Sequence, residues 1–455
     1  MSVTVVLFTR DLRVHDNPAL AAAVRRGSQV VPMFVIDDEI GSSSFNAPNR
    51  AAFLAAALAD LDQQLLQLGG RLVIRHGDTT DEVAGVVGEC RATELHFAAD
   101  VSAYSRRREQ ALRERLTPLG CRIAVHAGSI TVADPAQLVP STGRDHFAVF
   151  TPYYRRWQSV PRRRPLAPPT HIRLPEIASD RLPEASAICS GVASAELSVG
   201  GESTGRTLLT RWLGSAVGDY HEQSDNLPGD ETSHLSPYIH FGCLSVTEIL
   251  DRLDLSDPGS EAFARQLCWR DFHHQVLAAR PDAVTNDYRS REITWRTDDS
   301  AFEAWCEGRT GYPIVDAGMR QLRAQGWMAG RARLIAASLL SKSWRIDWRL
   351  GASYFERWLV DGDLANNRLN WQWAAGTGTD TRPNRVLNPL RQAERFDPQG
   401  EYVRRWVPEL SQLQGKAIHR PTRFGISEAV YPAPITFGPD INQGELDLFA
   451  TGRGS

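Results

Sequence analysis

Long apolar runs are absent from this sequence of 455 residues. No stretch approaches the roughly 18–20 apolar residues that a membrane-spanning helix needs, which excludes an integral membrane protein. The N-terminal MSVTVVLFTRDLR also lacks the basic-then-apolar layout of a secretory signal peptide and is typical of a buried strand. We therefore expect a cytoplasmic protein with no membrane partner.

Cysteine motifs are missing as well. The six cysteines are scattered, and none stands in a CxxC or Cys/His spacing. Neither a disulfide framework nor a zinc site is predicted. We expect small buried thiols and no metal centre.

Lysine is scarce, because Lys342 and Lys416 are the only two. Nearly all positive charge is arginine, whose planar guanidinium suits phosphate, although a GC-rich genome would produce the same bias. The net charge of −3 does not indicate a nucleic-acid partner. Any DNA contact must therefore come from a local patch.

Tryptophan is absent from the first third of the chain, since the first of the 12 tryptophans is Trp157. A chain of this length also exceeds one core of ordinary size. The uneven distribution of tryptophan predicts two domains with different chemistry.

Residues 1–130 alternate apolar runs with amphipathic stretches such as Arg50–Leu68 and Tyr104–Leu116. Strands are predicted at Val3–Phe8, Val30–Ile36, Arg71–Arg75, Glu94–Ala98 and Arg122–His126. This alternation predicts an α/β domain with a parallel five-stranded, Rossmann-like sheet. The turn TRDLRVHDNPAL carries no glycine fingerprint, so ordinary dinucleotide binding is not expected there.

The remaining chain divides into three parts. Residues 131–204 are rich in Pro, Ser and Arg and lack periodicity, which predicts an interdomain linker. Helical patterns dominate residues 205–435 and predict a large all-α domain. Residues 436–455 contain four glycines and one proline and are interpreted as a loose tail.

The segment Asp361–Trp373, DGDLANNRLNWQW, is the most informative. Asp363, Asn367 and Trp371 stand at i, i+4 and i+8 and would share one helical face. An acid, an amide and an indole in this order suit a planar heteroaromatic ligand. A partly buried polar helix face would give the same spacing.

Three further segments are ambiguous on their own. In TGYPIVDAGMRQL, Asp316 and Arg320 stand at i and i+4, and we expect them to pair. In TSHLSPYIHFG, hydroxyls at a helix start suit a phosphate or simply cap the helix. In QLCWRDF, Trp269 and Gln266 could bind a flipped base, although a core tryptophan would look similar.

Together these segments resemble the photolyase/cryptochrome family, most closely the bacterial class I cyclobutane pyrimidine dimer photolyases. The opening LFTRDLRVHDNPAL is similar to the family's first strand and turn, and TGYPIVDAGMRQL and DGDLANNRLNWQW are similar to its two signature regions. The resemblance covers roughly residues 1–410. It implies a light-driven flavoprotein that binds FAD in the helical domain.

The resemblance also implies roles for individual residues around FAD. Five residues would hold its diphosphate: Tyr220, Thr232, Ser233, Leu235 and Ser236. Around the flavin ring, Arg333 would pair with Asp361, Asp363 would lie near the ribityl and ring N–H region, Asn367 would face N5, and Trp327 would pack nearby. Trp371, Trp348 and Trp295 match the family's tryptophan triad, which passes electrons to the photoexcited flavin.

The α/β domain would hold an antenna chromophore. The implied contacts are Arg10, Asp37, Arg50, Asp100 and Tyr104, at the strand ends where open α/β sheets bind ligands. DVSAYSRRRE is more similar to members that use an 8-hydroxy-5-deazaflavin than to those that use a folate.

For DNA, the resemblance implies that a flipped pyrimidine dimer enters a cavity over the flavin. The implied contacts are Gln266, Trp269, Arg270 and Trp373, with Arg331, Lys342, Arg382 and Arg385 as candidates for phosphate contact. UV-damaged DNA would be the partner of a monomeric protein that needs no other protein.

The implied cavity departs from the family pattern at four positions. Gln266 replaces a glutamate, Gly330 an asparagine, Leu334 a methionine and Ser224 an arginine. The first prediction is a deoxyribodipyrimidine photo-lyase. The departures leave open a cryptochrome-like photoreceptor, and a (6-4) photolyase is disfavoured because positions 330 and 334 are not histidine.

Overall fold

The computed structural model describes residues 2–437. Two compact units divide the chain. Among the described residues, the first contains residues 2–221, 233–284 and 359–366, and the second contains residues 222–232, 285–358 and 367–437. The predicted domain boundaries at residues 130 and 204 stay predictions, and the predicted tail lies outside the described residues from 438 onward.

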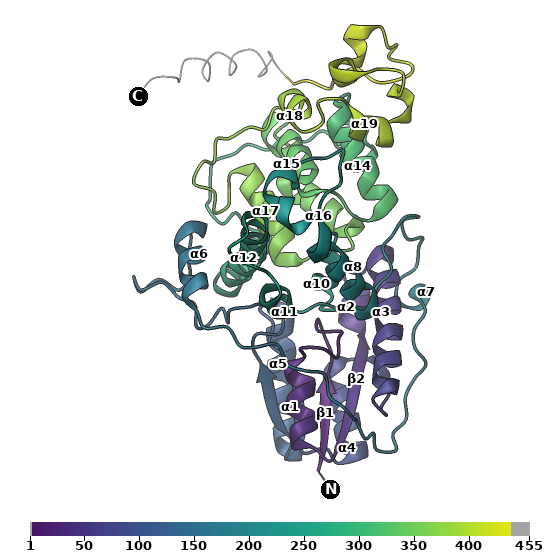
Figure 1. Cartoon of the computed structure of the whole chain (residues 1–455), viewed down its shortest axis with the longest axis vertical. Helices are drawn as coiled ribbons and strands as arrows, with labels where there is room; N and C mark the ends of the chain where they lie inside the picture. Colours follow the sequence, from purple (N-terminus) through teal and green to yellow (C-terminus); the bar gives the residue numbers. More distant parts are fainter. Residues whose placement is uncertain (1, 438–455) are drawn as a thin grey trace. The chain divides into compact units, whose positions relative to one another are not determined.

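A five-stranded parallel sheet forms the centre of the first unit (Figure 1). Its order is β3-β2-β1-β4-β5. The strands are β1 (Val3–Leu7), β2 (Gln29–Asp37), β3 (Val73–Gly77), β4 (Glu94–Ala98) and β5 (Arg122–His126). The predicted fold class and all five strands are confirmed.

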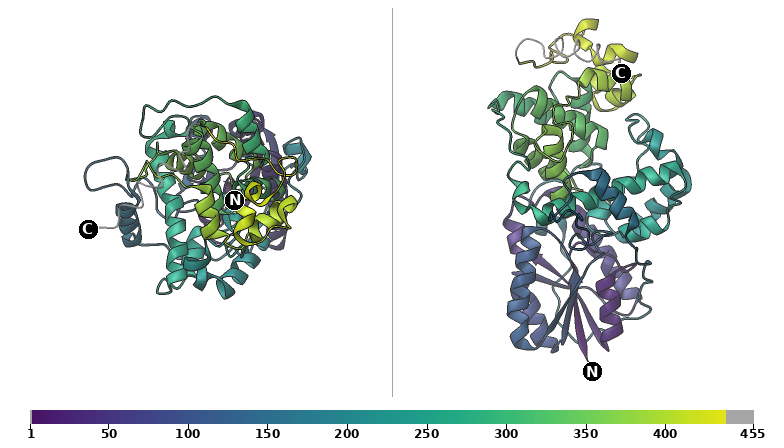
Figure 2. Two further views of the ribbon diagram at one scale, coloured as in Figure 1. Left: turned by 90° about the horizontal axis from the view of Figure 1, so that it is seen from above. Right: turned by 90° about the vertical axis from the view of Figure 1, so that its left-hand side faces the viewer.

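Helices cover both faces of this sheet, as the buried strands of a parallel sheet require. α4 (Thr79–Cys90) and α5 (Ala103–Leu116) lie on one face, and α1 (Pro18–Arg26) and α3 (Pro48–Gln67) lie on the other (Figure 2). The strand order reverses between β1 and β4. In such sheets, ligands bind outside the carboxyl ends of the strands at this reversal.

The first unit also contains shorter helices and one long helix. The helices are α2 (Asp38–Ser42), α6 (Phe150–Ser159), α7 (Ala185–Ile188), α8 (Glu202–Ser215), α10 (Ser236–His240), α11 (Val246–Asp251) and α12 (Pro258–Ala279), and α9 (Tyr220–Gln223) begins there. The prediction that residues 131–204 lack periodic structure is wrong at α6. Its side chains Phe150, Tyr153, Tyr154 and Trp157 are buried at i, i+3, i+4 and i+7, which is helical spacing.

In its described residues the second unit consists of helices and the loops between them, with one isolated β-bridge between Arg296 and Ile346. Its helices are α13 (Asp299–Glu307), α14 (Pro313–Gln325), α15 (Gly330–Ser338), α16 (Trp348–Trp358), α18 (Pro389–Phe396) and α19 (Glu401–Trp406), with a π-helical turn at Leu339–Ser343. α17 (Leu364–Ala375) begins in the first unit and continues in the second. Short 3-10 turns lie at Thr117–Leu119, Val217–Asp219, Pro281–Val284, Pro408–Leu410, Gly415–His419 and Pro421–Phe424.

The predicted pair between Asp316 and Arg320 is wrong. The Asp316 carboxylate instead accepts hydrogen bonds from the Thr310 backbone and hydroxyl, at 2.8 and 2.6 Å, and from the Tyr431 hydroxyl. Arg320 pairs with Glu409, at 2.7 and 2.9 Å. Asp316 is fully buried, so the amide and hydroxyls beside it satisfy it without the partly exposed guanidinium.

None of the helices in residues 2–437 is both long and apolar enough to cross a membrane. The same residues contain no group of three or more His, Cys, Asp or Glu side chains arranged to hold a metal ion. All six cysteines are free thiols, and Cys121, Cys243 and Cys268 are buried.

Candidate functional site

A charged cluster in the first unit joins the reversal point of the sheet to the start of α17. Arg10 follows β1 and pairs with the Asp363 carboxylate, and its Nη1 lies 3.5 Å from Oδ2 of Asp100, which follows β4. The other carboxylate oxygen of Asp363 accepts the backbone N–H of Asn366 at 2.9 Å and so caps α17. Nε2 of His274, on α12, lies 3.4 Å from the same carboxylate.

The charges in this cluster favour the ionised forms of Asp363 and Arg10. Burial opposes ionisation of Asp363, but the charges of His274 and Arg10 hold the pKa of that carboxyl well below its usual range. Burial alone would lower the pKa of Arg10, yet Asp363 and Asp100 raise it above its usual value. Burial lowers the pKa of His240, 4.0 Å from Asp363, and keeps that ring neutral.

Two of the predicted antenna residues, Arg10 and Arg50, have partners inside the first unit. Nη1 of Arg50 donates to the Leu359 carbonyl at 2.9 Å, and its guanidinium lies over the Phe45 ring at 4.3 Å. Both arginines therefore hold the segment 359–363, which leads into α17. This role was not predictable from sequence patterns, because Asp363 and Leu359 lie more than 300 positions away from the two arginines.

The other predicted antenna residues lie at the carboxyl end of the sheet. Asp37 ends β2, and its carboxylate caps α2 through the Ile40 amide at 3.1 Å and accepts the Thr79 amide at 3.3 Å. Asp37 and Thr79 lie beside the Tyr104 hydroxyl, and burial raises the pKa of that hydroxyl to about 12.

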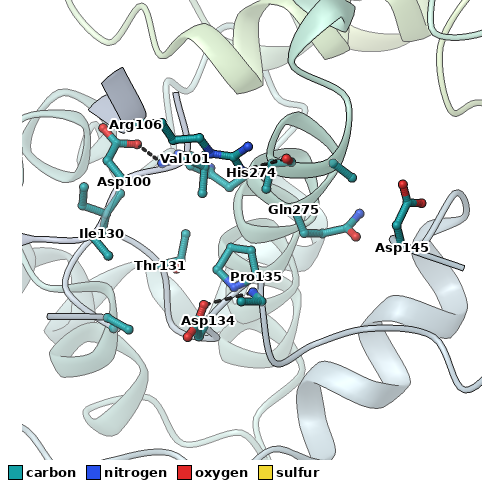
Figure 3. A pocket seen from close by; sticks show the side chains of 16 residues that line it. Asp100, Val101, Arg106, Ile130, Thr131, Asp134, Pro135, Asp145, His274 and Gln275 are labelled. Carbon is teal, nitrogen blue, oxygen red and sulfur yellow. Dashed lines mark hydrogen bonds between the residues drawn. The ribbon is translucent and has the colours of Figure 1, made fainter. Parts of the chain in front are cut away.

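A cavity of about 320 Å³ opens beside this region of the first unit (Figure 3). Its polar lining comes from Asp100, Arg106, Thr131, Asp134, Asp145, His274 and Gln275. Asp100 is the one predicted antenna residue among the lining residues. Asp100 and His274 therefore belong both to the cavity wall and to the charged cluster around Asp363.

The residues predicted to hold the FAD diphosphate are divided between the two units. In the first unit, Tyr220 packs edge-on against Trp212 and Phe263, Leu235 is fully buried, and the Ser233 hydroxyl accepts the Leu235 amide at 3.3 Å. Ser236 is the first residue of α10. In the second unit, the Thr232 hydroxyl is buried without a hydrogen-bond partner.

In the second unit, Asn367 on α17 faces α16. Its amide nitrogen donates to the Ala352 carbonyl at 2.9 Å and to Oε1 of Glu356 at 3.3 Å. Glu356 is held in turn by Arg368 at 2.6 and 2.7 Å. The donor side of the amide is therefore fixed within this unit, and the orientation of Asn367 is set.

Trp371 lies against the same helix. Its ring approaches Gly351 so closely that a Cβ built on that glycine would stand 2.2 Å from the indole. The ring also packs edge-on against Phe355 at 5.0 Å and against Trp305 of α13 at 5.9 Å between centroids. The Trp371 indole nitrogen is buried and has no hydrogen-bond partner.

The other two predicted relay tryptophans belong to the same unit. Trp348 begins α16, is fully buried, and donates its indole N–H to Oδ1 of Asp287 at 2.9 Å. It stands three residues before Gly351, one helical turn from the backbone that Trp371 contacts. Trp295 is half-buried in the segment before α13.

The remaining predicted flavin neighbours also have defined surroundings. In the second unit, Trp327 is buried, and Nε of Arg333 donates to the Met328 carbonyl at 2.8 Å. Asp361 is buried in the first unit.

Trp269, predicted to contact the DNA lesion, is stacked on Phe150 of α6. The two ring centroids are 3.7 Å apart and the planes are inclined by 3°. Arg265 lies over Phe150 at 5.2 Å and over Tyr154 at 5.0 Å. Sequence reasoning missed Phe150, although the aromatic spacing of α6 was the signal that could have found it.

The predicted polar contacts on α12 differ in exposure. Gln266 is exposed, one turn before Trp269. Arg270 is largely buried, and its guanidinium donates to the Ile130 carbonyl within the first unit. Burial lowers the pKa of Arg270.

The predicted phosphate contacts of the second unit also differ. Arg331 pairs with Asp225 and lies over the Phe396 ring at 4.4 Å. Lys342 donates to the Pro383 carbonyl at 2.6 Å. Arg382 and Arg385 are exposed, and Arg385 lies over the Trp373 ring at 5.5 Å. Arg382 and Arg385 are therefore the better placed for a phosphate.

Among the four positions that depart from the family pattern, Gly330 has open space around it. It is exposed at the start of α15, and an added Cβ would meet nothing within 4 Å. Leu334 and Ser224 are half-buried.

Two family models match the chain. One is described as DNA photolyase and covers residues 4–171, and the other as FAD binding domain of DNA photolyase and covers residues 263–440. A deoxyribodipyrimidine photo-lyase of Streptomyces griseus is 52% identical over 440 residues, which are 96% of this chain and 96% of that protein.

Solved structures are similar over nearly the whole chain. A class III photolyase from Agrobacterium tumefaciens has a TM-score of 0.90 at 31% identity, over 99% of this chain and 97% of that one. A cryptochrome from Synechocystis has a TM-score of 0.89 at 28% identity, over 96% of this chain and 97% of that one.

Proposed function

The chain belongs to the DNA photolyase family, and we propose that it uses blue light to split cyclobutane pyrimidine dimers in DNA, as a deoxyribodipyrimidine photo-lyase. The observation that carries this proposal is the 52% identity to the Streptomyces griseus enzyme across 96% of both proteins. This relationship covers nearly the whole length of the chain.

FAD, for which the chain has the family's binding domain, supplies the light absorption and the electron when it is bound. Buried polar atoms in the second unit fit such a ligand. The Thr232 hydroxyl and the Trp371 indole nitrogen have no hydrogen-bond partner in the described protein, and a bound ligand would satisfy them. Asn367 presents its amide oxygen while its nitrogen is held by Ala352.

We propose that Trp371, Trp348 and Trp295 deliver electrons from the protein surface. Trp371 and Trp348 are buried, so water cannot intercept charge between them. Trp295 is partly exposed and can exchange electrons with a soluble reductant. The packing of Trp371 against α16 supports this order.

Trp269 and Trp373 are proposed to stack on the flipped dimer. Each indole is already held by a neighbour of its own unit, Phe150 or Arg385. A held ring loses little entropy when a base stacks on it. Gln266 is exposed beside Trp269 and can donate its amide to the edge of a base.

An antenna of the 8-hydroxy-5-deazaflavin type is proposed at the carboxyl end of the sheet, near Asp37 and Tyr104. The carboxyl end of β2, the neighbour of β1 in the sheet, lies one strand from the reversal point and supports this location. Addition of the deazaflavin should produce energy transfer to FAD, seen as excitation of flavin fluorescence through the deazaflavin band.

A cryptochrome-like photoreceptor is the second candidate. The observation that favours it is the open space at Gly330, where the family pattern has an amide for the substrate. The similar Synechocystis cryptochrome structure agrees with a photoreceptor on this fold.

Photoreactivation in cells separates the two candidates. A bacterial host without a photolyase of its own should survive ultraviolet irradiation better in blue light than in the dark when it carries this gene. A Trp269→Ala variant should reduce that advantage. Equal survival in light and dark, with FAD-loaded protein present in the cells, would overturn the repair proposal in favour of the photoreceptor.

A further inference from the structure

We propose that Asp287 directs the electron relay, because its carboxylate is hydrogen-bonded to Trp348 and favours loss of an electron there over loss from Trp305. This inference rests on the proposed function, since the relay operates when photoexcited FAD oxidises Trp371. Asp287 lies in the loop before α13, and all the groups involved belong to the second unit.

Two tryptophans, Trp305 and Trp348, are close enough to Trp371 to act as its electron donor. Trp305 contacts it directly, with 5.9 Å between ring centroids, and Trp348 stands one turn from its contact at Gly351. Two further aromatic rings continue from Trp305. The Tyr354 ring centroid lies 5.6 Å from that of Trp305, and the Trp358 centroid lies 6.3 Å from that of Tyr354. Packing alone therefore offers a second route for the electron.

The hydrogen-bond acceptors of the two indoles differ in charge. Trp305 donates its N–H to the neutral Ala336 carbonyl at 3.1 Å, whereas Trp348 donates to the Asp287 carboxylate at 2.9 Å. Both rings are 0% exposed, so water stabilises neither after an electron is lost. A positive charge buried beside a carboxylate is compensated, and one beside a carbonyl is not.

Arg349 opposes this effect but is the weaker influence. Its guanidinium lies 4.8 Å from the Trp348 ring centroid and would repel a positive charge on the ring. It is one-third exposed and is shared between Asp287, at 2.9 Å, and Asp347, at 3.1 Å. The Asp287 oxygen touches the N–H itself, and that direct contact is screened less by solvent.

The step transfers one electron and breaks no bond. Trp371, oxidised by photoexcited FAD, takes an electron from Trp348 and returns to the neutral indole. The positive charge moves to Trp348, where the Asp287 carboxylate faces it through the N–H. Trp295 then reduces Trp348, and a soluble thiol reduces Trp295.

Flash photolysis of the FAD-loaded protein tests this inference through the absorbance of oxidised tryptophan. Asp287→Asn keeps an acceptor for the indole N–H but removes the charge. It should shorten the lifetime of the oxidised tryptophan by about tenfold, toward that of Trp348→Phe, because a hydrogen bond to a charged group becomes a neutral one. Asp347→Asn is the matched control, since Asp347 also binds Arg349 but not Trp348, and its lifetime should equal that of the wild type.

Arg349→Met provides a second test with the opposite sign. Removal of the cation over the ring should lengthen the lifetime, a result that a merely structural role for this loop would not give. A wild-type lifetime in Asp287→Asn would overturn the inference, whatever the lifetime in Arg349→Met. Trp371→Phe distinguishes a failure of the relay from a failure of the Asp287 proposal. Normal photoreduction in that variant would refute the proposed relay itself. Lost photoreduction in that variant, together with no effect of Asp287→Asn, would refute only the role of Asp287.

Discussion

Arg10 and Asp363 form an ion pair between the turn after the first strand and the residue that caps α17, although 353 positions separate them in the sequence. Asp100 and His274 surround the pair, so both charges are compensated inside the first unit. The cap of the helix that carries Asn367 and Trp371 thus depends on a residue of the α/β domain.

Arg10→Met should destabilise the protein by removing the partner of a buried carboxylate. The free energy of unfolding is expected to fall by about 3–5 kcal/mol, the usual cost of one unpaired buried charge. Denaturant unfolding followed by circular dichroism measures this change. Arg10→Met with Asp363→Asn should recover part of the loss, and a double variant as unstable as the single one would contradict the pairing.

Gly351→Ala should displace Trp371, because the new methyl group would stand 2.2 Å from the indole. Overpacking of this kind costs about 1–3 kcal/mol of unfolding free energy. Photoreduction of bound FAD should also slow. Gly330→Ala is the matched control, since a Cβ there meets nothing within 4 Å and should change the unfolding free energy by no more than about 0.5 kcal/mol. Equal effects of the two alanines would refute the close contact.

His273 predicts a dependence of stability on pH. Burial lowers the pKa of His273 to about 4, whereas an unfolded histidine titrates near pH 6.5. Between these values the unfolded chain binds one more proton than the folded chain, so stability is present at neutral pH and is lost as the pH falls. His273→Gln should reduce the slope of unfolding free energy against pH by up to about 1.4 kcal/mol per pH unit in this window. Unchanged slopes would contradict the buried neutral ring.

Phe150→Leu should weaken discrimination between damaged and undamaged DNA. Phe150 holds the Trp269 ring parallel at 3.7 Å, and leucine fills similar space without fixing that orientation. Affinities for oligonucleotides with and without a dimer, measured by fluorescence anisotropy, should move closer together. Tyr154→Phe removes only a hydroxyl bonded to Glu261 and should leave the ratio unchanged. A preserved ratio in Phe150→Leu would mean that Trp269 needs no support from α6.

The architecture followed from local patterns. Apolar runs and turns predicted all five strands to within two residues, because each strand is a short apolar run and the three central strands are largely buried. The helix of DGDLANNRLNWQW was also predicted, although it begins at Leu364, since Asp363 is its cap.

The wrong or missed predictions concern contacts that the spacing of residues in the sequence does not reveal. The i, i+4 spacing placed Asp316 near Arg320, but the Thr310 backbone was closer to the buried carboxylate. Composition made residues 131–204 look like a linker and hid the aromatic face of α6. Asp287 was missed because no pattern shows which carboxylate meets an indole 61 residues later.

Dimer repair by the purified protein is the decisive measurement for the proposed function. The protein, with its FAD chemically reduced, is mixed with an oligonucleotide that contains one cyclobutane pyrimidine dimer, and intact dimer is counted after blue light or darkness. We expect loss of the dimer in the light, none in the dark, and much slower loss with Trp269→Ala. A dimer that survives illumination, although FAD is bound and reduced, would contradict the assignment to DNA repair.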